Sequence, residues 1–105
     1  MAFVNTDVVL TNAAQTVMGA GTNGVLIFKA SVTNTDASAR SVTFYRVPMG
    51  GSPSLSNVVI DGETIAAGGT IVLPLSGQSL VNGQTLQGLA SVTSVVNVAV
   101  SGLAA

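Results

Sequence analysis

The runs VLIFKASVT (residues 25–33) and SVTFYRV (residues 41–47) decide the fold of this chain. Apolar residues occupy every second position of both runs: Leu26, Phe28, Ala30 and Val32 in the first, Val42 and Phe44 in the second. This period-2 alternation indicates strands with one buried face. The link between them, residues 34–39, is short and polar, so we expect the two strands to fold back on each other as an antiparallel hairpin.

Turn-forming residues divide the rest of the chain into short strands at intervals of about 8–12 residues. We expect these strands at residues 8–11, 15–18, 58–65, 70–75, 85–91 and 95–101. No segment shows helical periodicity over a useful length. The sequence therefore predicts an all-β fold, a single antiparallel β-sandwich of about eight short strands, with jelly-roll and Ig-like topologies both open. Residues 1–7 are expected to form a mobile N-terminal arm, and residues 8–105 the sandwich domain.

Several turn signals are specific. Gly62 interrupts the expected strand at residues 58–65 and indicates a β-bulge. Residues 66–69, Ala-Ala-Gly-Gly, predict a turn. Pro74 has no N–H to donate to a ladder, so it predicts an edge strand or the end of a strand. Asn82-Gly83 is the strongest hairpin-turn signal in the sequence.

Charged residues are scarce: they make up 7% of the 105 residues, with a net charge of −1, against about 25% in an average domain. The three cations are Lys29, Arg40 and Arg46, too few for the basic stripe that nucleic-acid binding requires. No cationic amphipathic helix or long apolar span indicates a membrane partner. So little charge also leaves little to keep a free monomer in solution. A surface decorated with Ser, Thr and Asn therefore favours a protein packed against other subunits.

The chain also lacks the side chains of most catalytic and metal sites. It has no cysteine and no histidine, which excludes Ser-His and Cys-His nucleophiles and the usual ligands of zinc and copper. Without disulfides, stability must come from the core, from assembly or from both. We therefore expect no enzyme activity, no cofactor and no metal.

Two of the four carboxylates, Asp61 and Glu63, are two positions apart and share a face of the expected strand. The simplest interpretation is a pair of solvated acids. The functional alternatives are a calcium site completed by a loop carbonyl and a glycosidase-like pair, the latter disfavoured by the lack of aromatic sugar platforms. Asp36 lies in the polar link beside Asn34, where Asx-turn hydrogen bonding accounts for it.

Four apolar residues are candidates for contacts with other subunits. Phe3 and Val4 lie in the expected arm, which could add a strand to a neighbour. Met49 and Leu55 are the large apolar residues of the Pro- and Gly-rich loop at residues 48–57. They either return to the edge of the core or contact a neighbour, because long loops in compact domains are often functional.

Arg46 is a fifth interface candidate. It continues the alternation of Val42 and Phe44 and so points towards the core, where an unpaired charge would be costly. Either it reaches water, at the rim of the sandwich or because a bulge turns it outwards, or it forms an ion pair with Asp61 or Glu63 of another subunit.

The blocks TNTD (residues 33–36), RSVTFYRVP (residues 40–48) and IAAGGT (residues 65–70), with the valine-rich strand near the end, resemble a known group of proteins. These are small uncharacterised β-sandwich proteins encoded among the structural genes of tailed bacteriophages. The resemblance covers most of the chain and rests on turn and strand patterns. It implies a virion structural protein: a capsid decoration or cement protein that binds between capsid subunits. The alternative is a tail- or head-fibre-associated domain that binds a host receptor or carbohydrate.

The implied partners are the major capsid protein or other virion proteins, together with further copies of this chain in a trimer or another cyclic oligomer. The implied location is the virion, assembled in the host cytoplasm. The absence of a signal-peptide pattern after Met1 and the absence of cysteine agree with that expectation.

Overall fold

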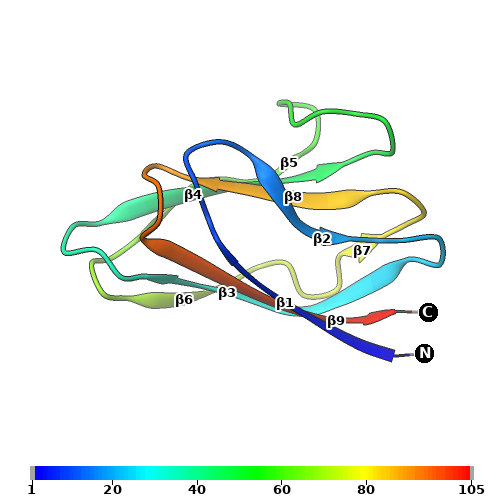
Figure 1. The fold of residues 1–105 in the computed structure, drawn as a ribbon, viewed down its shortest axis with the longest axis horizontal. Helices are drawn as coiled ribbons and strands as arrows, with labels where there is room; N and C mark the ends of the chain where they lie inside the picture. The colour runs from blue at the N-terminus through cyan, green and yellow to red at the C-terminus, as the bar shows by residue number, and fades with distance from the viewer. Residues whose placement is uncertain (1, 105) are drawn as a thin grey trace.

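The computed structural model describes residues 2–104, which form two antiparallel β-sheets packed face to face (Figure 1). The strands are β1 (Ala2–Val9), β2 (Gln15–Gly19), β3 (Val25–Asn34), β4 (Arg40–Val47), β5 (Val58–Ile65), β6 (Thr70–Leu73), β7 (Ser79–Leu80), β8 (Thr85–Ala90) and β9 (Val96–Ala104). Sheet A has the order β1-β9-β3-β6, with β7 also paired to β3, and sheet B has the order β2-β8-β4-β5. The predicted all-β sandwich is confirmed.

The strands pair from the two ends of the chain inwards. β1 pairs with β9, β2 with β8, β3 with β6 and β4 with β5, all antiparallel. This is one long hairpin, closed at the loop between β4 and β5, whose successive arms fall in opposite sheets. Such a rolled hairpin is a jelly roll, and it decides between the two topologies that the sequence left open.

The predicted hairpin between residues 25–33 and 41–47 is wrong, because β3 lies in sheet A and β4 in sheet B. The link crosses between the sheets instead, and the buried side chain of Asn34 holds the crossing. Its Nδ2 donates to the carbonyls of Ser38 (2.9 Å), Ile65 (3.1 Å) and Ala66 (3.3 Å), and its Oδ1 accepts from the N–H of Asp36 (3.0 Å). A short polar link suits an arch between sheets as well as a hairpin, so its composition could not separate the two.

The predicted buried face of β3 is correct only in its second half. Ala30 and Val32 are fully buried, but Leu26 and Phe28 are 40% and 41% exposed. The register against β9 shifts between Ile27 and Lys29, so a β-bulge at Phe28 changes which face each residue takes.

The predicted N-terminal arm is also wrong for residues 2–7. These residues belong to β1, which pairs without interruption along β9 from Ala2 opposite Ala104 to Val9 opposite Asn97. Asn5 and Asp7 are weak strand formers, but the valine-rich strand β9 supplies a partner that overrides propensity. The boundary between an arm and a domain at residues 7 and 8 therefore does not exist. Met1 lies outside the described residues.

The core lies between the two sheets. Its largest fully buried side chains include Phe44, Leu10, Ile27, Ile65, Leu73, Leu75, Leu80 and Leu86. Phe44 is opposite Gly88 in the ladder between β4 and β8. A Cβ at Gly88 would lie 2.6 Å from Cε2 of Phe44, so this ring fits because its neighbour has no side chain.

The predicted turns have different outcomes. Gly62 has φ 65° at a register shift between β4 and β5, which confirms the bulge. The turn at residues 66–69 is confirmed by the hydrogen bond from the Gly69 N–H to the Ala66 carbonyl (2.9 Å), and β6 ends just before Pro74. The turn at Asn82-Gly83 is present, but it joins β7 of sheet A to β8 of sheet B, so it does not close a hairpin.

Candidate interaction surface

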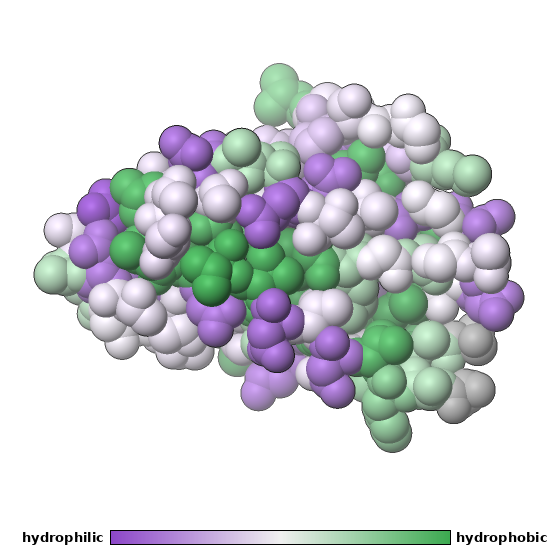
Figure 2. Space-filling model, viewed as in Figure 1, coloured by the Kyte–Doolittle hydropathy of each residue, from purple (hydrophilic) through white to green (hydrophobic). Residues whose placement is uncertain are grey.

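One end of the outer face of sheet A exposes a group of apolar side chains. Phe3 and Leu103 are opposite each other on β1 and β9, and Leu103 is opposite Leu26 on β3, so the three lie in one row across the sheet. Phe28, turned outwards by the bulge, brings its ring centroid to 6.1 Å from that of Phe3. We call Phe3, Leu26, Phe28 and Leu103 the outer-face patch. In Figure 2, apolar colour reaches the lower right of the molecule beside the chain ends.

Phe3 is the most exposed member of the patch, at 76% of its surface. An aromatic ring with that exposure makes few contacts within its own chain, so it contributes little to folding. Contiguous exposed apolar groups usually mark a surface that binds something. The patch is therefore the strongest candidate for an interaction surface in the described residues.

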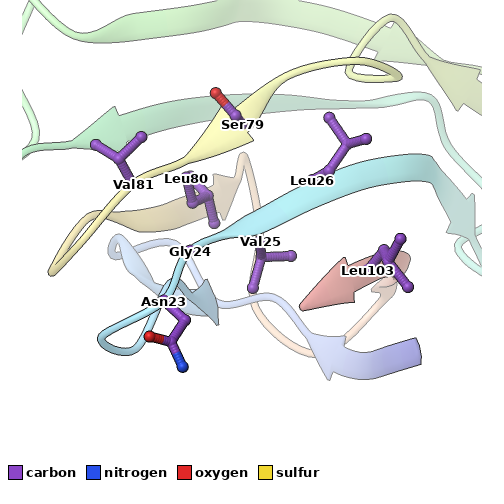
Figure 3. A pocket seen from close by; sticks show the side chains of 8 residues that line it. All are labelled: Asn23, Gly24, Val25, Leu26, Ser79, Leu80, Val81 and Leu103. Atoms are coloured by element: carbon purple, nitrogen blue, oxygen red, sulfur yellow. The ribbon is translucent and has the colours of Figure 1, made fainter. Parts of the chain in front are cut away.

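An open hollow of about 330 Å³ adjoins the patch (Figure 3). Leu26 and Leu103 belong to both the patch and the hollow. The other lining residues are Asn23, Gly24, Val25, Ser79, Leu80 and Val81. The volume is at the lower end of the range for small-molecule sites, and no lining side chain is ionisable. This hollow suits an apolar side chain of a partner better than a polar substrate.

The five interface candidates from the sequence do not form one site. Phe3 is in the outer-face patch, whereas Val4 is half-buried and packs against the core from the opposite face of β1. Met49 and Leu55, on the loop that closes the rolled hairpin, are 73% and 89% exposed. Met49 lies over the turn at Gly83, where an added Cβ would come within 2.7 Å of its side chain, while Leu55 is the most exposed large apolar residue described.

Arg46 lies at the rim of the sandwich, as the first of its two predicted alternatives requires. It is exposed, and its Nη1 donates to Oε1 of Gln78 at 2.7 Å. Arg46 and Gln78 also line the small apolar gap beside Leu86, so the stem of the arginine covers one end of the core. An ion pair with another subunit stays a prediction.

Sequence reasoning missed Leu26, Phe28 and Leu103 as surface residues. Apolar residues occupy both phases of the run from Val25 to Phe28, so alternation alone could not say which phase faces inwards. Lys29 gave no signal, because it faces outwards both in an unbroken alternation and with the bulge.

The carboxylates show no arrangement for chemistry. Among residues 2–104, no group of three His, Cys, Asp or Glu side chains could hold a metal ion. Gly62 bulges between Asp61 and Glu63, so these acids do not follow the regular alternation that would place both on one face. In this same part of the chain, no helix is long and apolar enough to cross a membrane.

Asp36 has a structural role in the link between β3 and β4. Its Oδ2 accepts from Arg40 at 2.6 Å, and its Oδ1 accepts from the N–H of Ala37 at 2.7 Å. The hydrogen bond from Arg40, followed by the one from Ala37, lowers the pKa of the Asp36 carboxyl below its usual value.

Comparison with models of known protein families gives no match for this chain, and comparison with curated proteins gives none either.

Proposed function

We propose that this chain is a non-catalytic structural component of a tailed-phage virion, a capsid decoration protein that binds between capsid subunits. The observation that carries the proposal is the outer-face patch beside an apolar hollow, on a chain with 7% charged residues. The sequence blocks that resemble phage structural proteins supply the virion context. Jelly rolls occur in viral capsid domains, which agrees by analogy of fold only.

The energetics of the patch suit attachment at many equivalent positions. A buried aromatic side chain covers roughly 150–250 Å², so Phe3 at 76% exposed and Phe28 at 41% together offer roughly 200 Å². At about 25 cal/mol per Å² this amounts to about 5 kcal/mol before the entropic cost of association. A standard interface buries about 800 Å² per partner. The patch is therefore an anchor that needs further contacts, and the exposed loop with Leu55 is one candidate source.

The second candidate is a fibre-associated domain that binds a receptor or carbohydrate. Jelly rolls also include lectins, and Asn23 and Ser79 place two polar side chains beside the hollow. The aromatic faces that sugar sites use are scarce, because Tyr45 is half-buried on sheet B and the two rings of the patch face each other at a tilt of 56°. Specific hits of the purified chain on a glycan array would favour this second function.

The proposal can be tested by measuring occupancy on particles. Virions purified from an infected culture that expresses the chain should contain it in a fixed ratio to the major capsid protein, measured by quantitative mass spectrometry. The double variant F3S/F28S should lower this ratio at least about tenfold, because the loss of roughly 5 kcal/mol of apolar burial exceeds the ~1.4 kcal/mol per factor of ten.

The matched control is V72S, which changes an apolar side chain, 63% exposed, on β6 of the same sheet and outside the patch. It should leave occupancy unchanged. Absence of the chain from purified particles, or equal occupancy for wild type and F3S/F28S, contradicts the proposal.

A further inference from the structure

The two sheets have several edge strands, and all but one have features that oppose pairing with a strand of another chain. β2 carries a bulge between Thr16 and Met18, and β5 has two register shifts and two exposed acids. β6 and β7, which share the third edge, have only four and two residues. β1 is eight residues long, keeps an unbroken register on β9 and contains neither proline nor lysine. Long, regular, unprotected edges are templates for another strand.

The hydrogen bond that follows the last β1–β9 residue pair shows which backbone N–H and C=O groups of β1 point towards β9 and which point away from it. The N–H of Leu10 donates to the carbonyl of Val96 at 2.8 Å, so even-numbered residues form the hydrogen-bonded pairs with β9. The N–H and C=O groups of Phe3, Asn5 and Asp7 therefore point to the open side. Among these outward groups of β1, the structure of residues 2–104 gives a partner only to the carbonyl of Val9, from Nε2 of Gln15.

We propose that β1 pairs with β1 of a second copy of this chain, antiparallel about a two-fold axis, so that two A sheets join into one continuous sheet. Hydrogen bonds form only if outward-pointing residues meet, so odd positions must lie opposite odd positions. The register that places Thr6 opposite Thr6 satisfies this rule. It sets Asn5 opposite Asp7, and Phe3 opposite Val9, of the second copy.

Side-chain pairs select this register over the neighbouring ones. An axis at Asp7 would place two like charges opposite each other, and an axis at Asn5 would place Phe3 opposite Asp7. With the axis at Thr6, Phe3 meets the β-branched Val9 on the outer face, a favourable cross-strand pair. In Figure 1, β1 crosses the front of the sandwich, and in the same view Figure 2 shows apolar side chains gathered on this side. Val4 and Val8 of β1 are both half-buried. In this register, Val4 of each copy lies opposite Val8 of the other copy.

Thr6 supplies an independent observation. In the described residues its Oγ1 is a buried side-chain oxygen without a hydrogen-bond partner, although buried polar atoms are normally paired. In the proposed register Thr6 forms a non-hydrogen-bonded backbone pair with its symmetry copy. Side chains approach most closely in such pairs, and Thr–Thr hydroxyl hydrogen bonds are a known cross-strand interaction. The second copy thus offers a partner to Thr6, which its Oγ1, shielded from solvent within one chain, reaches after rotation about χ1.

This inference goes beyond the proposed function and does not depend on binding to a virion. It also changes the oligomer expected from the sequence. Antiparallel pairing of β1 with itself is isologous, so it makes dimers or even-numbered assemblies, and three copies cannot satisfy it.

The test is the mass of the purified chain by sedimentation equilibrium at about 1–100 µM, where mass action reveals a dimer. We expect twice the 10.4 kDa of one chain. N5P should give a monomer with an unchanged circular-dichroism spectrum, because the N–H that proline removes points away from β9.

The register has its own test, in which two opposite charge changes must act in opposite directions. N5K sets Lys opposite Asp7 twice per dimer and should tighten dimerisation several-fold, whereas N5D sets two acids opposite each other and should weaken it about tenfold. N97K and N97D, on the neighbouring strand, are the controls. Each should change the dissociation constant of the dimer by less than about twofold. A wild-type monomer throughout the range, an N5P dimer, or N5K and N5D shifting in the same direction overturns the proposal.

Discussion

Asn34→Ala is the substitution that tests the account of the fold most sharply. Asn34 is fully buried, and its side chain makes four hydrogen bonds that connect the end of β3 to the link and to the end of β5. Alanine removes all four and takes the side-chain donor away from the carbonyl of Ile65, whose bond to Asn34 is buried.

The expected destabilisation can be worked from these bonds. Each of the four bonds contributes about 0.5–1.5 kcal/mol, and water replaces part of the larger values at the partly exposed carbonyls. The sum is about 2–4 kcal/mol, which is a large part of the 5–15 kcal/mol that usually separates folded from unfolded domains (about 0.1 kcal/mol per residue). At about 4–8 °C per kcal/mol, the melting temperature should fall by roughly 10–25 °C.

Urea unfolding followed by far-ultraviolet circular dichroism measures this change, because the chain contains no tryptophan. The matched control is Asn97→Ala, at an exposed position of β9, which should stay within about 0.5 kcal/mol of wild type. Asn34→Asp should also destabilise at neutral pH, since a carboxylate would then face three carbonyls. If Asn34→Ala costs no more than Asn97→Ala, the view that Asn34 holds the crossing is refuted.

Three further predictions concern single positions. Gly88→Ala should destabilise by about 1–3 kcal/mol in urea, because its Cβ would overlap the buried ring of Phe44; wild-type stability would contradict the packing described. Gly62→Ala should cost about 1–2 kcal/mol, since φ is 65° with open space around it, so a cost near zero would contradict the bulge. The lowered pKa of Asp36 means that the bond to Arg40 stabilises the fold above the ordinary pKa of 3.8 and is lost as pH falls through the lower folded value. The stability difference between wild type and D36N, from urea titrations at several pH values, should therefore shrink below pH 3.8; a difference that persists in acid would contradict this.

The strands themselves could be predicted from the sequence because alternation is a local signal. β4, β5 and β9 appear where period-2 patterns and turn residues place them, and Val42, Phe44 and Val98 are buried as expected. Local sequence patterns do not determine which two strands pair with each other. The crossing after β3 and the turn before β8 therefore have the composition of hairpins although each joins different sheets.

The candidate surface was harder to predict than the fold, and the reason lies in one inserted residue. A single bulge at Phe28 transfers Leu26 and Phe28 from the core face to the outer face. The sequence predicts Phe3 as an interface candidate, but as part of an arm, because its partner strand lies at the other end of the chain. Contacts that depend on such distant pairings are visible only once the ladder is known.

The central claim is that this chain acts by attachment through the exposed apolar end of sheet A. Electron cryomicroscopy of purified virions tests that claim most directly. We expect a jelly-roll density repeated at equivalent capsid positions, with Phe3 and Phe28 against the capsid. A chain that is absent from the particle, or bound with both rings facing solvent, would contradict it.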